Sequence, residues 1–544
     1  MNARHLIRGP FLLAIALGTF LPFIGLRDIV ISHEARVVQV ARQMAESGWP
    51  WNAQHIDVPQ TELVDLPEGK RLRSRADGAT MNVNPWIIPI LNGEVRLQKP
   101  PLPYWCSATL FRLFGNGEGM SRLVPAILGA LGVLFMWDLA RMLIGRVGAW
   151  YAGLIWFSSY FIVDEFRKSM ADPYLAFCTL AAIWAWARSA KSGGKPIWLM
   201  FFYAAIGISV LAKGPIIFVF VPVAVLGYRI YYGRRRGNRP LKSALIAHAV
   251  GVLIFVLIAA PWFIIVWKSV PNALELWRYE SIGELSDNVE KARGWWFYLP
   301  NLLQISLPWT PIWLMGLILP FKHPSRRRFF GVACTFVIVL IFSISNVKKN
   351  AYLLPLMPIQ TLVIAQGWLW LTAMLRVYKR NRPVSVPMLR TTVAALMFAM
   401  FIQILISVVL REQDNNRSPK DAARFVTRLM EESPNRSLLV SELAEEASVY
   451  LPLGLRDSKN SSEVLLIADD RRAGQADIVA NRIATTPAGN VVTREELPIP
   501  NAKGPRWKVF KLTIAPSSDP GQPRSDIPAP ATSSSESPAG RGSS

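Results

Sequence analysis

The sequence has few charged residues and few cysteines for its length. Only 18% of its 544 residues are charged and 51% are hydrophobic, a balance that soluble globular domains seldom have. The three cysteines, Cys106, Cys178 and Cys334, form no CxxC pair and lie in apolar surroundings. Neither a disulfide framework nor a cysteine zinc site is therefore expected, and the composition indicates a membrane protein.

Long apolar runs make up much of the chain. About eleven of them are long enough to cross the roughly 30 Å hydrocarbon core of a bilayer. The first follows Arg4 and Arg8 and lacks a small-residue cleavage site, so it is interpreted as an uncleaved span rather than a signal peptide. The expected spans are residues 9–26, 121–140, 147–164, 170–187, 196–212, 214–231, 243–267, 298–320, 328–345, 351–374 and 390–410.

The net charge of +23 follows the expected topology. With the N-terminus in the cytoplasm, every cytoplasmic loop is basic, above all residues 229–242 and 322–328. This is the pattern of the positive-inside rule, and attraction to anionic lipid phosphates is a second interpretation. A nucleic-acid partner is not expected, because the basic residues lie between apolar spans. The sequence predicts a multi-pass protein of the cell (inner or plasma) membrane.

The segments outside the membrane divide the chain further. A transmembrane domain, 1–410, carries two large extracytoplasmic loops, 27–120 and 268–297. The part that follows, 411–515, alternates β-type runs (RSLLVSEL, SEVLLIADD, RWKVFKLTI) with helical stretches and predicts a small extracytoplasmic α/β domain. Residues 516–544 are rich in Pro, Ser, Gly and Ala and are expected to be disordered.

An amphipathic helix is predicted directly after the first span, within residues 28–50. Apolar residues recur at helical spacing from Val37 to Met44, which is typical of a helix lying on the membrane surface. His33 and Glu34 stand at its start. They are either solvated first-turn residues, with Glu34 favoured by the helix dipole, or groups that take part in chemistry.

Two further ionisable residues occupy constrained positions. Lys99 precedes two prolines, which stiffen the backbone and can open a helix. It could hold a phosphate, or it could be an interfacial lysine that snorkels to the membrane surface. Asp172 lies at the start of a span, where an acid is costly unless it is paired or functional; the alternative is a helix cap before Pro173.

Several basic residues share the outer face of the expected topology. They fall at the ends of spans, where one alone means little, but together they suggest a site for a lipid-linked phosphate. The basic residues are Lys213, Arg293, Lys348 and Lys349, and Tyr352 lies on the same face.

With these residues in place, the sequence resembles the bacterial branch of the protein O-mannosyltransferase family, which includes aminoarabinose transferases that modify lipid A. The family's acidic motif at the start of a surface helix corresponds to HEARV at 33–37, and its Glu-Lys-Pro-Pro to QKPP at 98–101. Its Asp-Pro span start corresponds to 172–173, its TKG to AKG at 212–214, and its Tyr-x-Leu-Pro to 352–355. The ordered motifs cover much of the transmembrane domain.

The resemblance implies a GT-C fold: an α-helical polytopic membrane protein with about eleven transmembrane helices. It implies inverting transfer of a sugar from a polyprenyl phosphate to a lipid, protein or glycan acceptor on the extracytoplasmic face. The base would be His33 or Glu34, and Asp172 would orient the acceptor or the base. The substrate-binding residues that it implies are Arg36, Lys99, Lys213, Arg293, Lys348 and Tyr352.

Three departures from the family pattern limit this hypothesis. His33 replaces the first aspartate, Gln98 replaces a glutamate, and Ser281 replaces a histidine. The last two positions bind a divalent ion in some family members, so no metal cofactor is expected here. A secondary transporter, a polysaccharide ligase or polymerase, and a non-catalytic relative that binds lipid-linked sugars are the alternatives.

Overall fold

The chain forms two compact units in the computed structural model, Met1–Asn415 and Asn416–Ser544. Ser281, with the rest of residues 279–292 of the expected loop 268–297, and the expected disordered tail lie outside the described residues. The residues that the structure describes are 8–66, 69–74, 78–233, 241–278, 293–345, 348–378, 385–405, 418–432, 436–440, 449–451, 463–469, 492–500 and 507–514.

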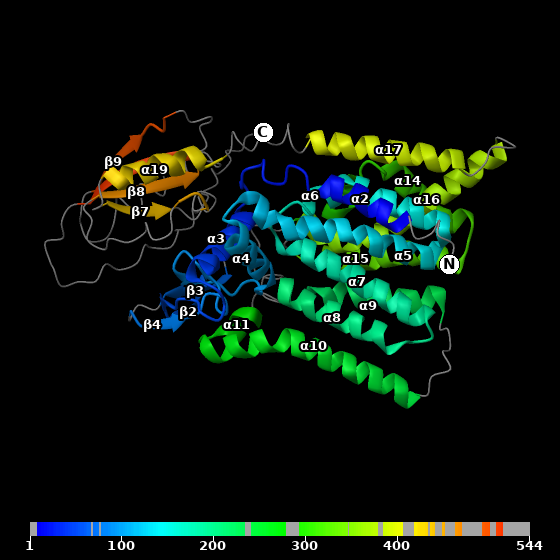
Figure 1. Ribbon diagram of the computed structural model, residues 1–544, viewed down its shortest axis with the longest axis horizontal. Helices are drawn as coiled ribbons and strands as arrows, with labels where there is room; N and C mark the ends of the chain where they lie inside the picture. The colour runs from blue at the N-terminus through cyan, green and yellow to red at the C-terminus, as the bar shows by residue number, and fades with distance from the viewer. Residues whose placement is uncertain are drawn as a thin grey trace, which may run out of the picture. The chain divides into compact units, whose positions relative to one another are not determined.

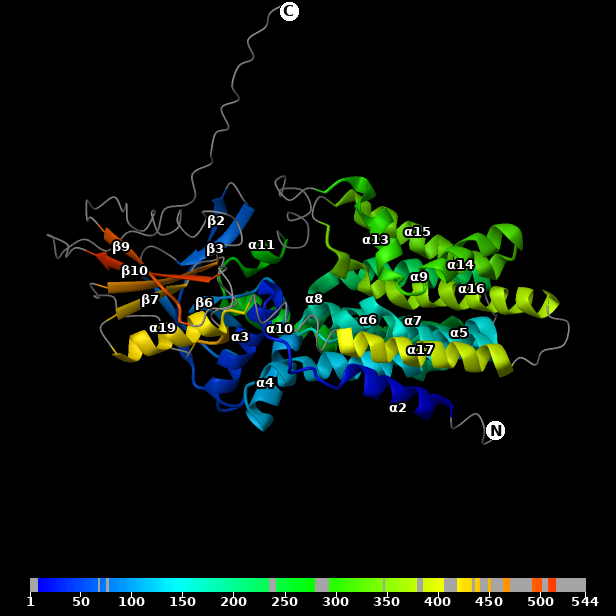
Figure 2. The same ribbon diagram turned by 90° about the horizontal axis from the view of Figure 1, so that it is seen from above.

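Most of the first unit is a bundle of apolar helices that lie side by side (Figure 1, Figure 2). Between them run the short 3-10 helices η1 (Gly214–Ile216), η4 (Trp295–Phe297), η5 (Arg326–Arg328) and η6 (Asn350–Leu356). The helices of the bundle are α2 (Arg8–Phe20), α5 (Glu118–Ser158), α6 (Tyr160–Glu165), α7 (Ala171–Lys191), α8 (Pro196–Lys213), α9 (Ile217–Tyr232), α10 (Leu241–Ser269), α13 (Tyr298–Ile305), α14 (Thr310–Lys322), α15 (Phe329–Ile344), α16 (Met357–Tyr378) and α17 (Ser385–Ile404).

The long helix α5 reverses direction within its length. Gly145 has φ +85 and a non-helical ψ, a conformation that residues with a Cβ rarely adopt. On the far side of this turn, Trp156 donates a hydrogen bond of 2.9 Å to the carbonyl of Gly129, and a Cβ at Gly132 would meet the same indole at 2.7 Å. The two halves of α5 therefore pack against each other, as the two expected spans 121–140 and 147–164.

The number of membrane spans is only partly settled by helix length. Among the described residues, five helices are long and apolar enough to cross a membrane, or six if α13 and α14, bent by 114°, form one span. Two of these five, α5 and the segment Pro196–Tyr232, each cover two expected spans. The expected total of about eleven spans therefore stays a prediction.

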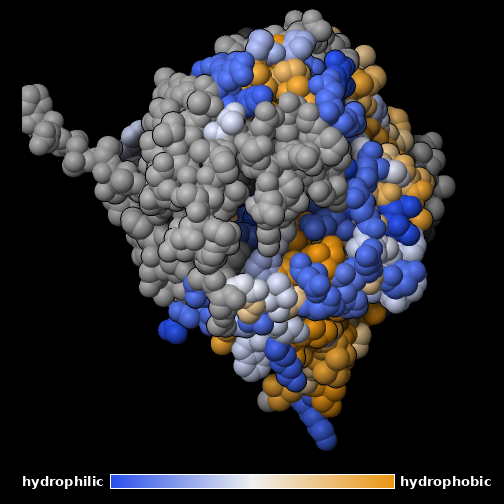
Figure 3. Space-filling model, turned by 90° about the vertical axis from the view of Figure 1, so that its left-hand side faces the viewer, coloured by the Kyte–Doolittle hydropathy of each residue, from blue (hydrophilic) through white to orange (hydrophobic). Residues whose placement is uncertain are grey.

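One face of α10 is apolar and exposed. Leu253, Leu257 and Trp267 are each more than half exposed, although the helix is the most hydropathic of the candidate spans. Figure 3 shows hydrophobic atoms in the lower part of its view, on the side where Figure 1 places α10. Such a face matches the hydrocarbon of a bilayer and needs no protein partner.

The expected first loop covers one end of the bundle (Figure 1, Figure 2). The predicted amphipathic helix is confirmed as α3 (Ser32–Ser47), with Val37, Val40 and Met44 buried. The other elements at this end are α4 (Leu102–Phe114), α11 (Ala273–Arg278) and the strands β1 (Ile56–Pro59), β2 (Thr61–Leu66), β3 (Gly69–Ser74), β4 (Thr80–Val83), β5 (Ile90–Leu91) and β6 (Glu94–Val95), paired β1–β4, β2–β3 and β5–β6.

The second unit contains a four-stranded sheet and the amphipathic helix α19 (Lys420–Glu432). The strand order is β7-β8-β10-β9, with β7 parallel to β8 and the other neighbours antiparallel. Val426 of α19 packs with Leu465, Ile467 and Val509 in its core. The strands are β7 (Arg436–Val440), β8 (Glu463–Asp469), β9 (Val492–Leu497) and β10 (Trp507–Ile514); the sequence patterns predicted all of these except β9.

Candidate active site

His33 lies in the first turn of α3, at the end of the bundle that the first loop covers. Its ring is exposed, and Nε2 is 2.8 Å from Nζ of Lys349. A lysine ammonium only donates hydrogen bonds, so Nε2 accepts and the ring proton stays on Nδ1. Partial loss of hydration, together with the charges of Lys349, Arg36 and Lys99, lowers the pKa of His33 to about 3, and Asp172 opposes them. The imidazole is therefore neutral at pH 7.

Asp172, Lys213 and Tyr352 come together from three elements. Asp172 lies buried in the first turn of α7, and Nζ of Lys213 forms an ion pair with its Oδ1. Lys213 is the last residue of α8, because Gly214 (φ +75) ends that helix. The same Nζ lies 4.9 Å from the centroid of the Tyr352 ring in η6. Lys213 thus bridges a carboxylate and an aromatic ring.

Glu34 faces away from solvent and has several partners. Its Oε1 accepts hydrogen bonds from Nε of Arg122 at 2.7 Å and from the backbone amide of Ser169 at 2.9 Å. Its Oε2 accepts one from Nη2 of Arg122 at 3.0 Å. Burial raises the pKa of Glu34, but Arg122 and the Ser169 amide outweigh burial, so the pKa lies below its ordinary value of 4.5. Glu34 is therefore ionised and ties the start of α3 to α5 and to the loop before α7.

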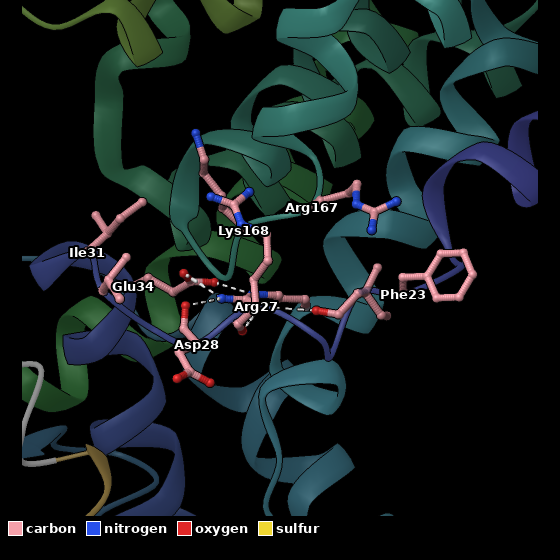
Figure 4. Close-up of a pocket in the computed structure, with 10 residues that line it drawn as sticks. Phe23, Arg27, Asp28, Ile31, Glu34, Arg167 and Lys168 are labelled. Carbon is pink, nitrogen blue, oxygen red and sulfur yellow. Dashed lines mark hydrogen bonds and ion pairs between the residues drawn. The ribbon is translucent and has the colours of Figure 1, made fainter. Parts of the chain in front are cut away.

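A small pocket borders Glu34 on the side of the chain that leads into α3. Figure 4 shows Arg27, Asp28, Glu34, Arg167 and Lys168 around it. Nζ of Lys168 pairs with Asp164 at 2.7 Å and with Glu165 at 2.6 Å, and Arg27 pairs with Asp164 at 3.4 Å. Neither this ion network nor the pairing of Arg122 with Glu34 was predicted. In the sequence, each of these residues looks like an ordinary charged residue near the end of a helix.

Arg293 and Lys348 also lie near each other, but Lys348 is buried whereas Arg293 is exposed. Nζ of Lys348 donates to the carbonyl of Arg293 at 2.8 Å and to the carbonyl of Ser345. The guanidinium of Arg293 lies 4.6 Å from the centroid of the Phe297 ring. The lysine that reaches His33 is instead Lys349, which the sequence placed with the other basic residues of the outer face but which was not among the implied substrate-binding residues. Sequence alone offers no means of telling apart two adjacent lysines before a helix.

Arg36 and Lys99 complete the surroundings of His33. Both are partly buried, Arg36 one turn further along α3 and Lys99 two residues before Pro101, which caps the start of α4. Next to Lys99, Oε1 of Gln98 is buried and accepts no hydrogen bond. Within the described residues, no group of three or more His, Cys, Asp and Glu side chains is arranged to hold a metal ion. That the site works without a metal stays a prediction.

The arrangement combines an exposed imidazole with a surplus of cations. Lys349, Arg36 and Lys99 act on His33 with positive charge, and Asp172 is the carboxylate that acts in the opposite sense. Preorganised cations of this kind stabilise the charge that develops on a departing phosphate. A neutral imidazole beside them is a group that can accept a proton.

Comparisons with known proteins point in the same direction. A family model described as dolichyl-phosphate-mannose-protein mannosyltransferase matches residues 98–265. An undecaprenyl phosphate-α-4-amino-4-deoxy-L-arabinose arabinosyl transferase of Pseudomonas fluorescens is 28% identical over 51% of this chain and 51% of its own length. A protein of the same description from Proteus mirabilis is 27% identical over 52% of each chain. The chain thus aligns with about half the length of these curated relatives.

Solved structures share the fold. ArnT from Cupriavidus metallidurans, bound to undecaprenyl phosphate, matches with a TM-score of 0.65 at 16% identity, over 94% of this chain and 98% of that one. The archaeal oligosaccharyltransferase AglB from Archaeoglobus fulgidus matches with a TM-score of 0.51 at 11% identity, over 96% and 75%. These similarities agree with the resemblance that the sequence motifs predicted: the chain shares the GT-C fold of these structures, and its sequence is similar to that family of membrane glycosyltransferases.

Proposed function

We propose that the protein is a membrane glycosyltransferase that moves a sugar from a polyprenyl-phosphate donor to an acceptor on the extracytoplasmic face. The observation that carries the proposal is the convergence of His33, Asp172, Lys213, Lys349 and Tyr352 from separate segments at one end of the bundle. The relatives support this donor class, because their names specify undecaprenyl phosphate. The acceptor is a lipid, a protein or a glycan.

The charges suggest how the donor is held. Lys99 and Arg36 lie close enough to His33 for their positive charges to lower its pKa. In this proposal they bind the phosphate of the donor, and Lys213 joins them. Tyr352 offers a hydroxyl as a further hydrogen-bond donor. Arg293 and Lys348 stay predicted contacts of the donor. We assign no resident metal ion to the site.

Transfer with inversion requires one base next to the acceptor hydroxyl. In the proposed step His33 takes the hydroxyl proton while the acceptor oxygen attacks C1 of the sugar from the face opposite the phosphate. The bond between C1 and the phosphate oxygen breaks, and its electron pair leaves with the phosphate. Glu34 is less suited to be the base because Arg122 and the Ser169 amide occupy it. Asp172 orients the acceptor or the ring of His33.

The proposed orientation places the N-terminus in the cytoplasm and the site at the outer face of the membrane. The basic segments 229–242 and 322–328 are then cytoplasmic, as the positive-inside rule requires. The C-terminal domain is extracytoplasmic in the same topology. A site at this boundary meets a donor anchored in the membrane and an acceptor that arrives from outside.

The test is an assay of the purified full-length protein with labelled polyprenyl-phosphate sugars and lipid, peptide and glycan acceptors. We expect a glycosidic product that forms equally with and without a chelator, and that is lost in His33→Ala, Asp172→Ala and Lys99→Ala. Survival of transfer in His33→Ala would overturn the assignment of the base, and its loss in Glu34→Ala alone would point to Glu34 instead. Flux of lipid-linked sugar across vesicles without any glycosidic product would favour the transporter instead.

A further inference from the structure

We infer that Lys349 caps the proton-accepting nitrogen of His33 in the unliganded site, and that a bound prenyl phosphate draws this lysine away. The inference deepens the proposed function and rests on it, because it names the event that makes His33 available. Lys349 is a positioning residue in this scheme, since it acts through His33.

The geometry of the pair carries the inference. Nζ of Lys349 lies 2.8 Å from Nε2 of His33, so the lone pair that would take a proton from an acceptor is already engaged. The other ring nitrogen carries the proton and cannot accept a second one without making the ring cationic. While this contact persists, His33 cannot act as a base.

Four charged groups from different segments act on the ring. Lys349 stands directly before η6, Arg36 lies on α3, and Lys99 lies in the segment before α4. Asp172, at the start of α7, is already paired with Lys213. Positive charge therefore dominates around an imidazole that solvent still reaches. Such a site resists protonation of the ring and attracts an anion.

A phosphate reverses both effects at once. The phosphodiester of a sugar-linked donor carries one negative charge, and among Lys349, Arg36 and Lys99 it offers the lysine a stronger partner than a neutral imidazole. Its charge also favours an imidazolium nearby. The nitrogen that Lys349 leaves can then take the acceptor's proton in the transfer step. His33 thus becomes a base only when a donor is bound, which keeps it inactive in the empty site.

The experiment follows the ring of His33 by nuclear magnetic resonance. The full-length protein is prepared in detergent micelles with 15N-labelled histidine, and the His33 signals are assigned by comparison with His33→Gln. Without ligand, we expect a neutral ring with the proton on Nδ1 and a pKa well below 6.5. Farnesyl phosphate should raise that pKa by about two units or more, as an added negative charge at contact distance predicts.

Variants and a matched ligand separate the possible causes. Lys349→Gln should raise the pKa of His33 without any ligand, and Lys349→Arg should restore the wild-type titration. Lys195→Gln, an exposed loop lysine, loses the same charge away from the site and should change nothing. Farnesol has the same chain without the phosphate and should also leave the titration unchanged.

The outcomes distinguish this inference from the proposed function. Binding is read in the same samples from the 31P signal of farnesyl phosphate. If the phosphate binds and the His33 titration does not move, or if Lys349→Gln titrates like the wild type, the inference is wrong while the donor class stands. If farnesyl phosphate does not bind at all, the proposed donor fails and the inference fails with it.

Discussion

The acids and the imidazole of the candidate site are each held by a cation. Asp172 pairs with Lys213, Glu34 pairs with Arg122, and His33 meets Lys349. A buried carboxylate is costly without such a partner, so the pairing stabilises the site. It also means that the adjacent ionisable residues His33 and Glu34 have different roles. Glu34 is buried and fully hydrogen-bonded, whereas His33 is open to a ligand.

Replacing Asp172 tests the role of the carboxylate near His33. Asp172→Asn removes its charge and leaves Lys213 without its ion-pair partner. We expect kcat for sugar transfer to fall by about 100-fold or more, the usual effect of losing a group that assists proton transfer. Asp138→Asn is the matched control, because Asp138 is also buried and paired, with Arg188. Equal losses of activity in the two variants would contradict a catalytic role.

The lowered pKa of His33 predicts a pH dependence of stability. The unfolded chain takes up a proton at this ring near pH 6.5, whereas the folded chain stays neutral down to about pH 3. The contribution of the neutral His33 ring to the free energy of unfolding is therefore fully present above pH 6.5 and is lost as the pH falls towards 3. Between pH 6.5 and 4, the melting temperature of His33→Gln should fall less than that of the wild type. Parallel curves would refute this prediction.

At the scale of elements, one ion pair fixes the first surface helix to the bundle. Arg122 of α5 holds Glu34 and also donates to the carbonyls of Ile24 and Arg27, at 3.0 and 2.7 Å. These contacts connect the segment after α2, the start of α3 and α5. Because His33 is the neighbour of Glu34, the same contacts set where the imidazole stands.

Breaking this ion pair should loosen the helix and displace the imidazole. Arg122→Met leaves Glu34 buried without its cation, which costs about 3–5 kcal/mol of unfolding free energy. Thermal unfolding in detergent should show a lower melting temperature, and limited proteolysis should cleave near α3. Adding Glu34→Gln to Arg122→Met removes the unpaired charge and should recover part of the stability. A double variant less stable than Arg122→Met would speak against this account.

At the scale of the whole molecule, the orientation of the bundle decides which substrates reach the site. The site shares its end of the bundle with the first loop (Figure 1, Figure 2). The basic 3-10 helix η5 and the preceding exposed Ser325 belong to an expected cytoplasmic loop. The proposed reaction needs the end of the bundle that carries the first loop to lie outside the cell, and the loop that contains η5 to lie in the cytoplasm.

Labelling of introduced cysteines in intact cells tests that orientation. Asn92→Cys, in an exposed turn of the first loop, should react with a membrane-impermeant maleimide without permeabilisation. Ser325→Cys should react only after permeabilisation. Both are made in a chain whose three buried or half-buried cysteines have been replaced. Labelling of Asn92→Cys only in permeabilised cells would place the site in the cytoplasm and end the proposal.

The sequence by itself determined several elements and where charges fall along them. The apolar periodicity specified α3, Lys213 fell between two expected spans, and Asp172 fell in the first turn of α7. These features depend on neighbours within a few residues, so local physics suffices to predict them.

Only the tertiary structure decided which charges meet. Glu34 and Arg122 are 88 positions apart, and His33 and Lys349 are 316 apart. No local pattern distinguishes Lys349 from Lys348, or the ionised anchor Glu34 from the neighbouring His33 as the exposed base. The choice follows from how the helices pack, because burial and partner distance set which group is paired, which is hydrated and which can take a proton.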